Sequence, residues 1–118
     1  EYDLLRTKKV LSYYRKSPSK WYRAPFGKLS KSMQRVLKTH DMIHVLPDVF
    51  AHDTFIPDPK WIAKYILKKV KPGSIILIHM PERGLREWNF EAMELTLIGL
   101  QEKGLKVLNL SQMTNEIK

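Results

Sequence analysis

The hydrophobic and polar positions along the chain predict helices that alternate with strands. Apolar residues spaced three and four apart predict helices over residues 2–15, from residue 30, over 58–70 and over 89–103. Ser30 is the expected cap of the second helix, and Asp58 followed by Pro59 is the expected start of the third. Short apolar runs predict strands at residues 21–23, 42–46, 74–78 and 106–110. The order helix, strand, repeated four times with connections long enough for right-handed crossovers, predicts a parallel sheet covered by helices.

The fold class that this order predicts is α/β, a partial (β/α) barrel of about four alternating helix/strand units with parallel strands. A complete barrel of this kind takes about 250 residues, and the chain has 118. We therefore expect residues 1–118 to be a single domain fragment. Because half a barrel exposes strand edges, we also expect a partner for them, either a missing amino-terminal half or a second copy of the chain.

The strand predicted at residues 74–78 ends on a histidine. After Pro72 and Gly73 come a serine and four apolar residues, and His79 follows directly. The carboxyl end of a parallel strand is where α/β folds place their chemistry, and histidine is the most frequent acid and base in enzymes. The alternative is a structural histidine that hydrogen-bonds a loop.

The net charge of +9 is concentrated in the first third of the chain. Residues 1–38 hold eleven Lys and Arg and two acidic residues, whereas residues 39–118 hold ten of each. Aromatic residues stand among these cations, as they do in nucleic-acid-binding segments: Tyr13, Tyr14, Trp21 and Tyr22. Such charges are more often a solvated helix face, and the segment has no helix-turn-helix or RNA-recognition signature, so we do not expect nucleic acid as a partner.

The composition excludes cysteine chemistry, and the apolar runs exclude a membrane-spanning helix. The chain has no cysteine, which excludes disulfides, thiolate metal sites and cysteine nucleophiles. The longest apolar run of the chain is far shorter than the roughly 20 residues that a membrane-spanning helix requires, so the sequence predicts no such helix. No cellular compartment is indicated.

Three clusters follow predicted strands, and together they resemble a known family. They are Trp21-Tyr22-Arg23-Ala24-Pro25-Phe26-Gly27, the pair Asp48 and Asp53, and Leu77-Ile78-His79. The first is similar to the Arg-x-Pro-(Tyr/Phe)-Gly motif of the polysaccharide deacetylase (NodB homology) family, and the last to its Leu-x-His motif. Lys71-Pro72-Gly73-Ser74 is similar to the lead-in of that family. The resemblance covers nearly all of the chain and corresponds to the carboxyl-terminal half of the family's domain.

This resemblance implies a metal-dependent hydrolase that removes N-acetyl groups from a polysaccharide or oligosaccharide such as chitin or peptidoglycan. It implies that His79 is the general acid that protonates the departing amine, and that Arg23 orients the carboxylate base through charge-assisted hydrogen bonds. It further implies that the Phe26 backbone N–H donates to the oxyanion, that Pro25 belongs to the same substrate-binding loop, and that Leu77 lines the pocket for the acetyl methyl group.

The chain departs from the family pattern at two places. Where the family has Asp-x-x-Asp-Trp, this sequence has Asp48 and Asp53, five residues apart and followed by Thr54-Phe55. A carboxylate beside His79 would help the imidazole to hold its proton, and either aspartate fits that role. The Thr-Phe-Asp-Asp-Gly and His-x-x-x-His motifs, which carry the base and the metal ligands, do not occur at the family's positions.

The implied cofactor is a zinc-like divalent metal whose ligands we expect in the missing amino-terminal half, so that the fragment alone is inactive. His40 and His44 have the His-x-x-x-His spacing, but one falls at a predicted helix end and the other in a strand, about 13 Å away. We therefore predict no metal ligand in this chain. The alternative function is a catalytically inactive relative that binds carbohydrate or nucleic acid.

Overall fold

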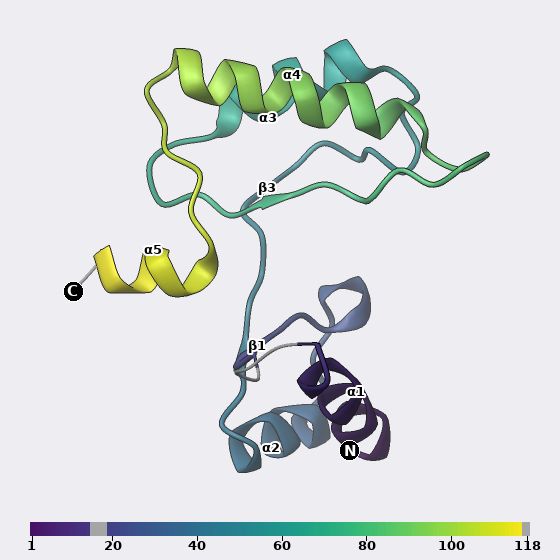
Figure 1. Cartoon of the computed structure of the whole chain (residues 1–118), viewed down its shortest axis with the longest axis vertical. Coiled ribbons are helices and arrows are strands. Elements are labelled where there is room, and N and C mark those ends of the chain that lie inside the picture. The colour runs from purple at the N-terminus through teal and green to yellow at the C-terminus, as the bar shows by residue number, and fades with distance from the viewer. Residues whose placement is uncertain (15–18, 117–118) are drawn as a thin grey trace. The chain divides into compact units, whose positions relative to one another are not determined.

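The computed structural model describes residues 1–14 and 19–116, which fall into two compact units (Figure 1). Unit 1 is Glu1–Leu46 and unit 2 is Pro47–Lys118. Each unit combines helices with one pair of short parallel strands. None of the described helices is both long and apolar enough to cross a membrane.

Unit 1 contains two helices and one strand pair. In chain order its elements are α1 (Tyr2–Ser12), β1 (Trp21–Tyr22), the 3-10 turn η1 (Pro25–Gly27), α2 (Lys31–Thr39) and β2 (Ile43–His44). The Ser30 hydroxyl caps α2 by accepting a hydrogen bond from the Met33 N–H at 3.2 Å, as the sequence pattern predicts. Strands β1 and β2 are parallel, with Trp21 opposite Ile43.

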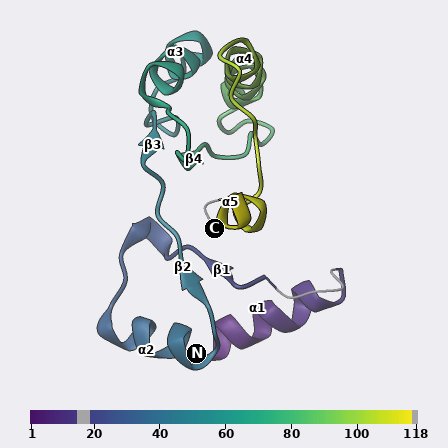
Figure 2. The ribbon, with the colours of Figure 1, turned by 90° about the vertical axis from the view of Figure 1, so that its left-hand side faces the viewer.

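Unit 2 packs two helices on its strand pair. Its elements are β3 (Val49–Phe50), α3 (Pro59–Lys69), β4 (Ile76–Leu77), α4 (Trp88–Glu102) and α5 (Leu110–Glu116). The Asp58 carboxylate caps α3 by accepting from the Trp61 N–H at 2.9 Å, and Pro59 takes the first helical position. Helices α3 and α4 lie side by side over one face of β3 and β4, which are parallel to each other (Figure 2).

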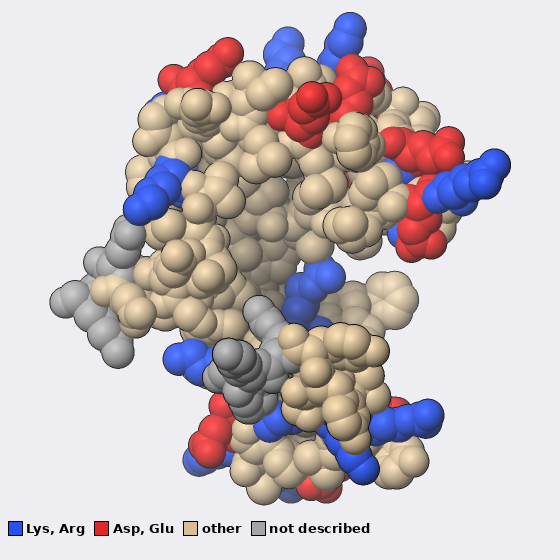
Figure 3. Space-filling view, in the orientation of Figure 1, with Lys and Arg blue, Asp and Glu red and all other residues tan. Residues whose placement is uncertain are grey.

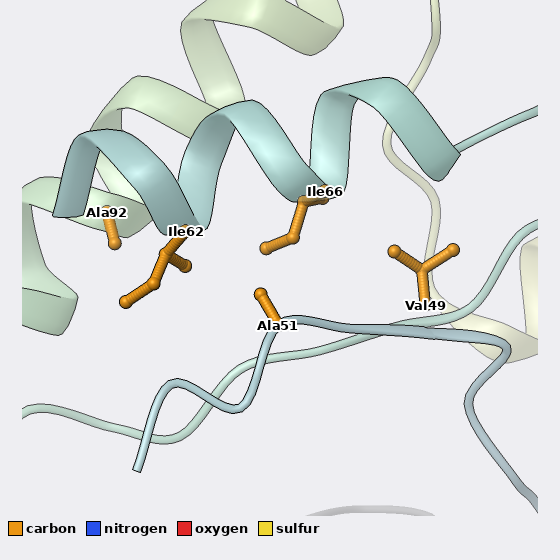
Figure 4. Close-up of a cluster of buried hydrophobic side chains, with 5 residues drawn as sticks. All are labelled: Val49, Ala51, Ile62, Ile66 and Ala92. Carbon is orange, nitrogen blue, oxygen red and sulfur yellow. The ribbon is translucent and has the colours of Figure 1, made fainter. Parts of the chain in front are cut away.

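The buried core of unit 2 lies between α3 and the strands. Ile62 and Ile66 are four residues apart on one face of α3, and both are fully excluded from solvent. They pack with three smaller side chains from β3, from the loop after it and from α4 (Figure 4): Val49, Ala51 and Ala92. This cluster holds α3 against the strands that lead to the candidate site.

The predicted partial (β/α) barrel is wrong. The four strands of the described residues are two residues long each, and they form two separate two-stranded sheets, β1 with β2 and β3 with β4. No barrel closes, because such short strands provide few ladder hydrogen bonds and because each pair stays within its own unit.

The strand predicted at residues 106–110 is also wrong, because the chain there leads into α5. Asn109 Oδ1 accepts a hydrogen bond from the Gln112 N–H at 2.9 Å, and Gln112 Oε1 accepts from the Asn109 N–H at 3.0 Å. This reciprocal pair is the pattern that starts a helix. Conversely, strand β3 at Val49–Phe50 was not predicted, because a two-residue strand is defined by its pairing with β4 rather than by a hydrophobic pattern.

Two helix ends differ from the sequence expectation. Helix α1 ends at Ser12 rather than at residue 15, which lies outside the described residues. Helix α4 begins at Trp88 rather than at Asn89. The second difference places Asn89 inside the first turn, where its side chain takes part in the candidate site.

Candidate functional site

The side chains of Asp53 and His79 meet beyond the ends of β3 and β4. Because β3 and β4 are parallel, the residues that follow them emerge at the same end of the pair. His79 Nδ1 lies 3.1 Å from Oδ1 and 3.2 Å from Oδ2 of Asp53, and the His79 backbone N–H donates to Oδ2 at 2.7 Å. The carboxylate of Asp53 therefore holds both the backbone and the ring of His79.

The two side chains differ in exposure. The Asp53 side chain is 2% exposed, whereas that of His79 is 38% exposed. In the part of the chain that the structure describes, His79 Nε2 has no hydrogen-bond partner. One ring nitrogen is thus anchored on a buried carboxylate, and the other is available to a molecule from outside.

Two residues in the first turn of α4 complete the site. The Asn89 amide donates to Asp53 Oδ2 at 2.6 Å and to the His79 carbonyl at 2.9 Å, and the Trp88 indole N–H donates to the Asp53 carbonyl at 2.9 Å. Asn89 is completely buried, and its Oδ1 has no partner among the described residues. The Asn89 amide and the His79 backbone N–H thus provide donors that the buried carboxylate requires, and the Trp88 indole holds the backbone of Asp53.

Sequence reasoning gave Asn89 no part in the site. It predicted that Asn89 begins a helix, and an asparagine in that position ordinarily caps its own helix with its side chain. Only the start of α4 at Trp88 shows that the amide is directed at Asp53 instead. No pattern in the sequence distinguishes these two uses of an asparagine.

A left-handed residue precedes Asp53. His52 has a φ of 50°, and its carbonyl accepts hydrogen bonds from the Phe55 and Ile56 N–H groups at 3.0 and 3.2 Å. Histidine adopts this region more readily than bulky or β-branched residues do. The turn that these hydrogen bonds close contains Asp53, three residues beyond the end of β3.

Asp48 is the other aspartate that we considered as the partner of His79. It lies at the start of β3 instead. Its carboxylate accepts hydrogen bonds from the Ser74 hydroxyl at 2.9 Å and from the Ile75 N–H at 2.5 Å. Desolvation acts to raise the pKa of Asp48, but the hydrogen bonds from Ile75 and Ser74 outweigh it, so the pKa lies below its usual value of 3.8. Asp48 thus ties β3 to the segment before β4, and the aspartate in contact with His79 is Asp53.

The remaining residues that the resemblance singled out lie in both units. Leu77 is half-buried in β4, two residues before His79 and opposite Phe50. Arg23, Pro25 and Phe26 belong to unit 1, where Arg23 is exposed after β1 and the other two form part of η1. Phe26 has a φ of 56° and is 97% exposed, so its ring is not part of the hydrophobic core of unit 1.

The two histidines with metal-ligand spacing lie in unit 1, whereas the Asp53–His79 pair lies in unit 2. No three His, Cys, Asp or Glu side chains of the described residues gather into a possible ligand set. His40, one of the two histidines with metal-ligand spacing, binds Glu1 instead, with 2.9 Å between Nε2 and Oε1, and this hydrogen bond lowers the pKa of Glu1. His44 lies in β2 and its buried Nε2 has no partner among the described residues.

The geometry of Asp53 and His79 suits proton transfer. A carboxylate at Nδ1 favours the tautomer that carries a proton on that nitrogen, and it stabilises the imidazolium when Nε2 is also protonated. Nε2 can then donate a proton, or accept one when the ring is neutral.

No protein-family model matches this chain, and no curated protein matches its sequence.

Proposed function

We propose that this chain forms part of a metal-dependent hydrolase that removes N-acetyl groups from a polysaccharide or oligosaccharide, and that His79 is its general acid. One observation carries the proposal: His79 is anchored through Nδ1 on the buried Asp53 while its half-exposed ring leaves Nε2 available. The order of the Arg23–Gly27 and Leu77–His79 motifs, similar to that of the deacetylase family, supports the same assignment.

The proposed role of His79 follows from the chemistry of amide cleavage. The amine of an N-acetylated sugar leaves readily only when it receives a proton as the tetrahedral intermediate collapses. The imidazolium of His79 donates that proton from Nε2, and the Asp53 carboxylate at Nδ1 keeps the ring oriented and offsets its charge. Asn89 and Trp88 hold Asp53 in place.

The other residues take the roles that the family resemblance implies. Arg23 orients the carboxylate base, the Phe26 backbone N–H donates to the oxyanion, Pro25 shapes the same loop, and Leu77 lines the pocket for the acetyl methyl group. Because the described residues contain no ligand set for a metal ion, the proposal assigns the metal and the base to a partner segment. β3 and β4 each pair with a single strand, which leaves edges that such a partner can cover.

The test is acetate release from N-acetylated oligosaccharides such as chitohexaose by the natural protein that contains this chain, supplied with zinc. His79→Ala removes the proton donor, so we expect the turnover number to fall by about 10²- to 10⁴-fold. Asp53→Asn keeps the shape of the side chain but removes its charge, and we expect a smaller loss of turnover. Substrate binding stays unchanged in both variants.

The matched control is His52→Asn, which replaces a neighbouring exposed histidine by a residue that tolerates the same left-handed backbone. We expect its turnover to stay near that of the natural protein. If His79→Ala keeps full turnover, His79 is not the general acid. If the natural protein binds the glycan but releases no acetate, the inactive carbohydrate-binding alternative is favoured.

A further inference from the structure

Unit 1 carries nearly all of the net charge of the protein. Residues 1–46 contain eleven Lys and Arg against three Asp and Glu, a net charge of +8, whereas residues 47–118 contain ten against nine, a net charge of +1. In the face shown in Figure 3, most of the acidic side chains lie on unit 2. A concentration of one sign of charge produces a local field that attracts polyanions.

One face of α2 is a row of cations. Lys31, Arg35 and Lys38 follow one another at spacings of four and three residues, which places them on the same side of the helix. All three are exposed, and none forms an ion pair with any residue that the structure describes. Because like charges four residues apart destabilise a helix slightly, a bound anion would stabilise this arrangement.

One face of α1, extended by its C-terminal cap residue Tyr13, places two tyrosines on either side of two cations. Tyr2, Arg6, Lys9 and Tyr13 follow at spacings of four, three and four residues and so share a side of the helix. Tyr2 is 75% exposed and Tyr13 is 76% exposed. None of the residues of α1 is buried. Exposed rings beside cations provide stacking surfaces and charge together, which suits a ligand with flat faces and anionic groups.

We infer that unit 1 binds an acidic polysaccharide through the cationic row of α2 and the aromatic-cationic face of α1. Charge complementarity requires a polyanion. Tyr2 and Tyr13 are about 16 Å apart along the helix axis, whereas proteins that bind single-stranded nucleic acid stack successive bases on aromatic side chains. This spacing favours separate sugar rings of an extended glycan over neighbouring bases.

The inference also narrows the substrate of the site in unit 2, and that step rests on the proposed function. If the glycan bound by unit 1 is the one that is hydrolysed, it carries carboxylate, phosphate or sulfate groups besides its N-acetyl groups. Both units belong to one chain, so a glycan held by unit 1 is present at a raised local concentration for His79.

The first experiment measures binding of the chain to fluorescently labelled polygalacturonate and to the neutral glycan chitohexaose by anisotropy. We expect the affinity for the acidic polymer to exceed that for the neutral oligosaccharide by at least about tenfold. Because the contacts are ionic, the affinity should fall about tenfold or more between 50 and 200 mM NaCl. Equal binding to both glycans, or binding insensitive to salt, would overturn the inference.

The second experiment compares two triple charge reversals. Lys31→Glu, Arg35→Glu and Lys38→Glu together alter α2, and Lys60→Glu, Lys64→Glu and Lys68→Glu make the same change in net charge on the exposed side of α3 in unit 2. We expect the α2 variant to lose at least about tenfold in affinity and the α3 variant to stay within about twofold. An equal loss in both would show a diffuse charge effect and contradict a site in unit 1.

Two further comparisons keep the result interpretable. Changing Lys31, Arg35 and Lys38 to Gln removes the positive charges without adding negative ones. This variant should also bind polygalacturonate more weakly, and circular dichroism checks that its helices are retained. Tyr2→Leu with Tyr13→Leu should weaken binding of polygalacturonate, whereas Phe90→Leu, which changes an equally exposed ring in unit 2, should not.

Competition with oligothymidylate and with vesicles of anionic lipid tests the choice of ligand. Tighter binding of either competitor than of polygalacturonate at equal salt would overturn the assignment to a glycan.

His79→Ala should bind polygalacturonate with unchanged affinity, since His79 belongs to unit 2. A failure of the hydrolysis test with intact binding therefore contradicts the proposed function alone, and a failure of binding contradicts only this inference.

Discussion

At the scale of single residues, Asp53 and His79 depend on support from the first turn of α4. The Asn89 amide bridges the Asp53 carboxylate and the His79 carbonyl, so one buried side chain restrains both members of the pair. The sequence identified His79 and left two candidates for its carboxylate partner. The parallel register of β3 and β4 decides between them, because Asp53 and His79 both follow their strands, whereas Asp48 precedes β3 and contacts Ser74 and Ile75.

Asn89→Ala should lower the free energy of unfolding by about 2–3 kcal/mol, because a buried charged acceptor loses a donor. The same change should make the His79 ring mobile, which nitrogen NMR of the imidazole can detect. Asn115→Ala is the control, since the Asn115 side chain is exposed and forms no hydrogen bond with the described residues. Its effect on the free energy of unfolding should stay within about 0.5 kcal/mol. Equal effects of the two substitutions would refute the bridging role of Asn89.

Asp48 gives a prediction about pH. Because its pKa is lower in the folded protein than the ordinary 3.8, the Asp48 carboxylate contributes stability above that value and loses the contribution as the pH falls through the folded pKa. Asp48→Asn should therefore be less stable than the natural chain at pH 7, and the difference should shrink toward pH 3. Urea unfolding at several pH values measures this difference.

The control for that measurement is Glu102→Gln, which removes a carboxylate with no hydrogen bond among the described residues. Its difference from the natural chain should change little over the same pH range. A constant difference for Asp48→Asn from pH 7 to pH 3 would show that the bonds to Ser74 and Ile75 do not depend on the charge of Asp48.

At the scale of elements, the helices follow from the sequence better than the strands do. The caps at Ser30 and Asp58 are local hydrogen bonds between residues three apart, so the pattern that predicts them also makes them. Strands of two residues exist only where another strand lies beside them, and for that reason β3 was missed and a strand at 106–110 was wrongly expected. The packing of α3 on α4 is likewise a nonlocal property.

Gly99 permits that packing. A Cβ at residue 99 would overlap the Leu67 side chain of α3, so Gly99→Ala should lower the free energy of unfolding by about 1–2 kcal/mol even though alanine favours helices. In a Leu67→Ala background the overlap is absent, and Gly99→Ala should then stabilise the protein by about 1 kcal/mol. Thermal or urea unfolding of the four proteins checks this change of sign. Destabilisation in both backgrounds would mean that Leu67 is not the obstacle.

At the scale of the whole molecule, the chain divides into a strongly basic unit and a nearly neutral one. Unit 1 buries few apolar side chains, with Ala24 and Leu37 the buried ones among its described residues, whereas unit 2 contains the larger core and the Asp53–His79 pair. The sequence showed the uneven charge but not its division between units, because the predicted barrel assumed one continuous sheet. The concentrated charge and the Asp53–His79 pair therefore lie in different units, so charge reversal on α2 and substitution of His79 test the two proposals separately.

The sequence by itself determined four of the five described helices, the caps of two of them, the uneven charge and the apolar segment that leads to His79, since each depends on residues close together in the chain. The tertiary structure alone decided which strands pair, that no barrel closes, that Asp53 rather than Asp48 contacts His79, and that Asn89 supports them both. These features join residues 10 to 36 positions apart. Such contacts depend on how the chain turns between them, and local patterns do not carry that information.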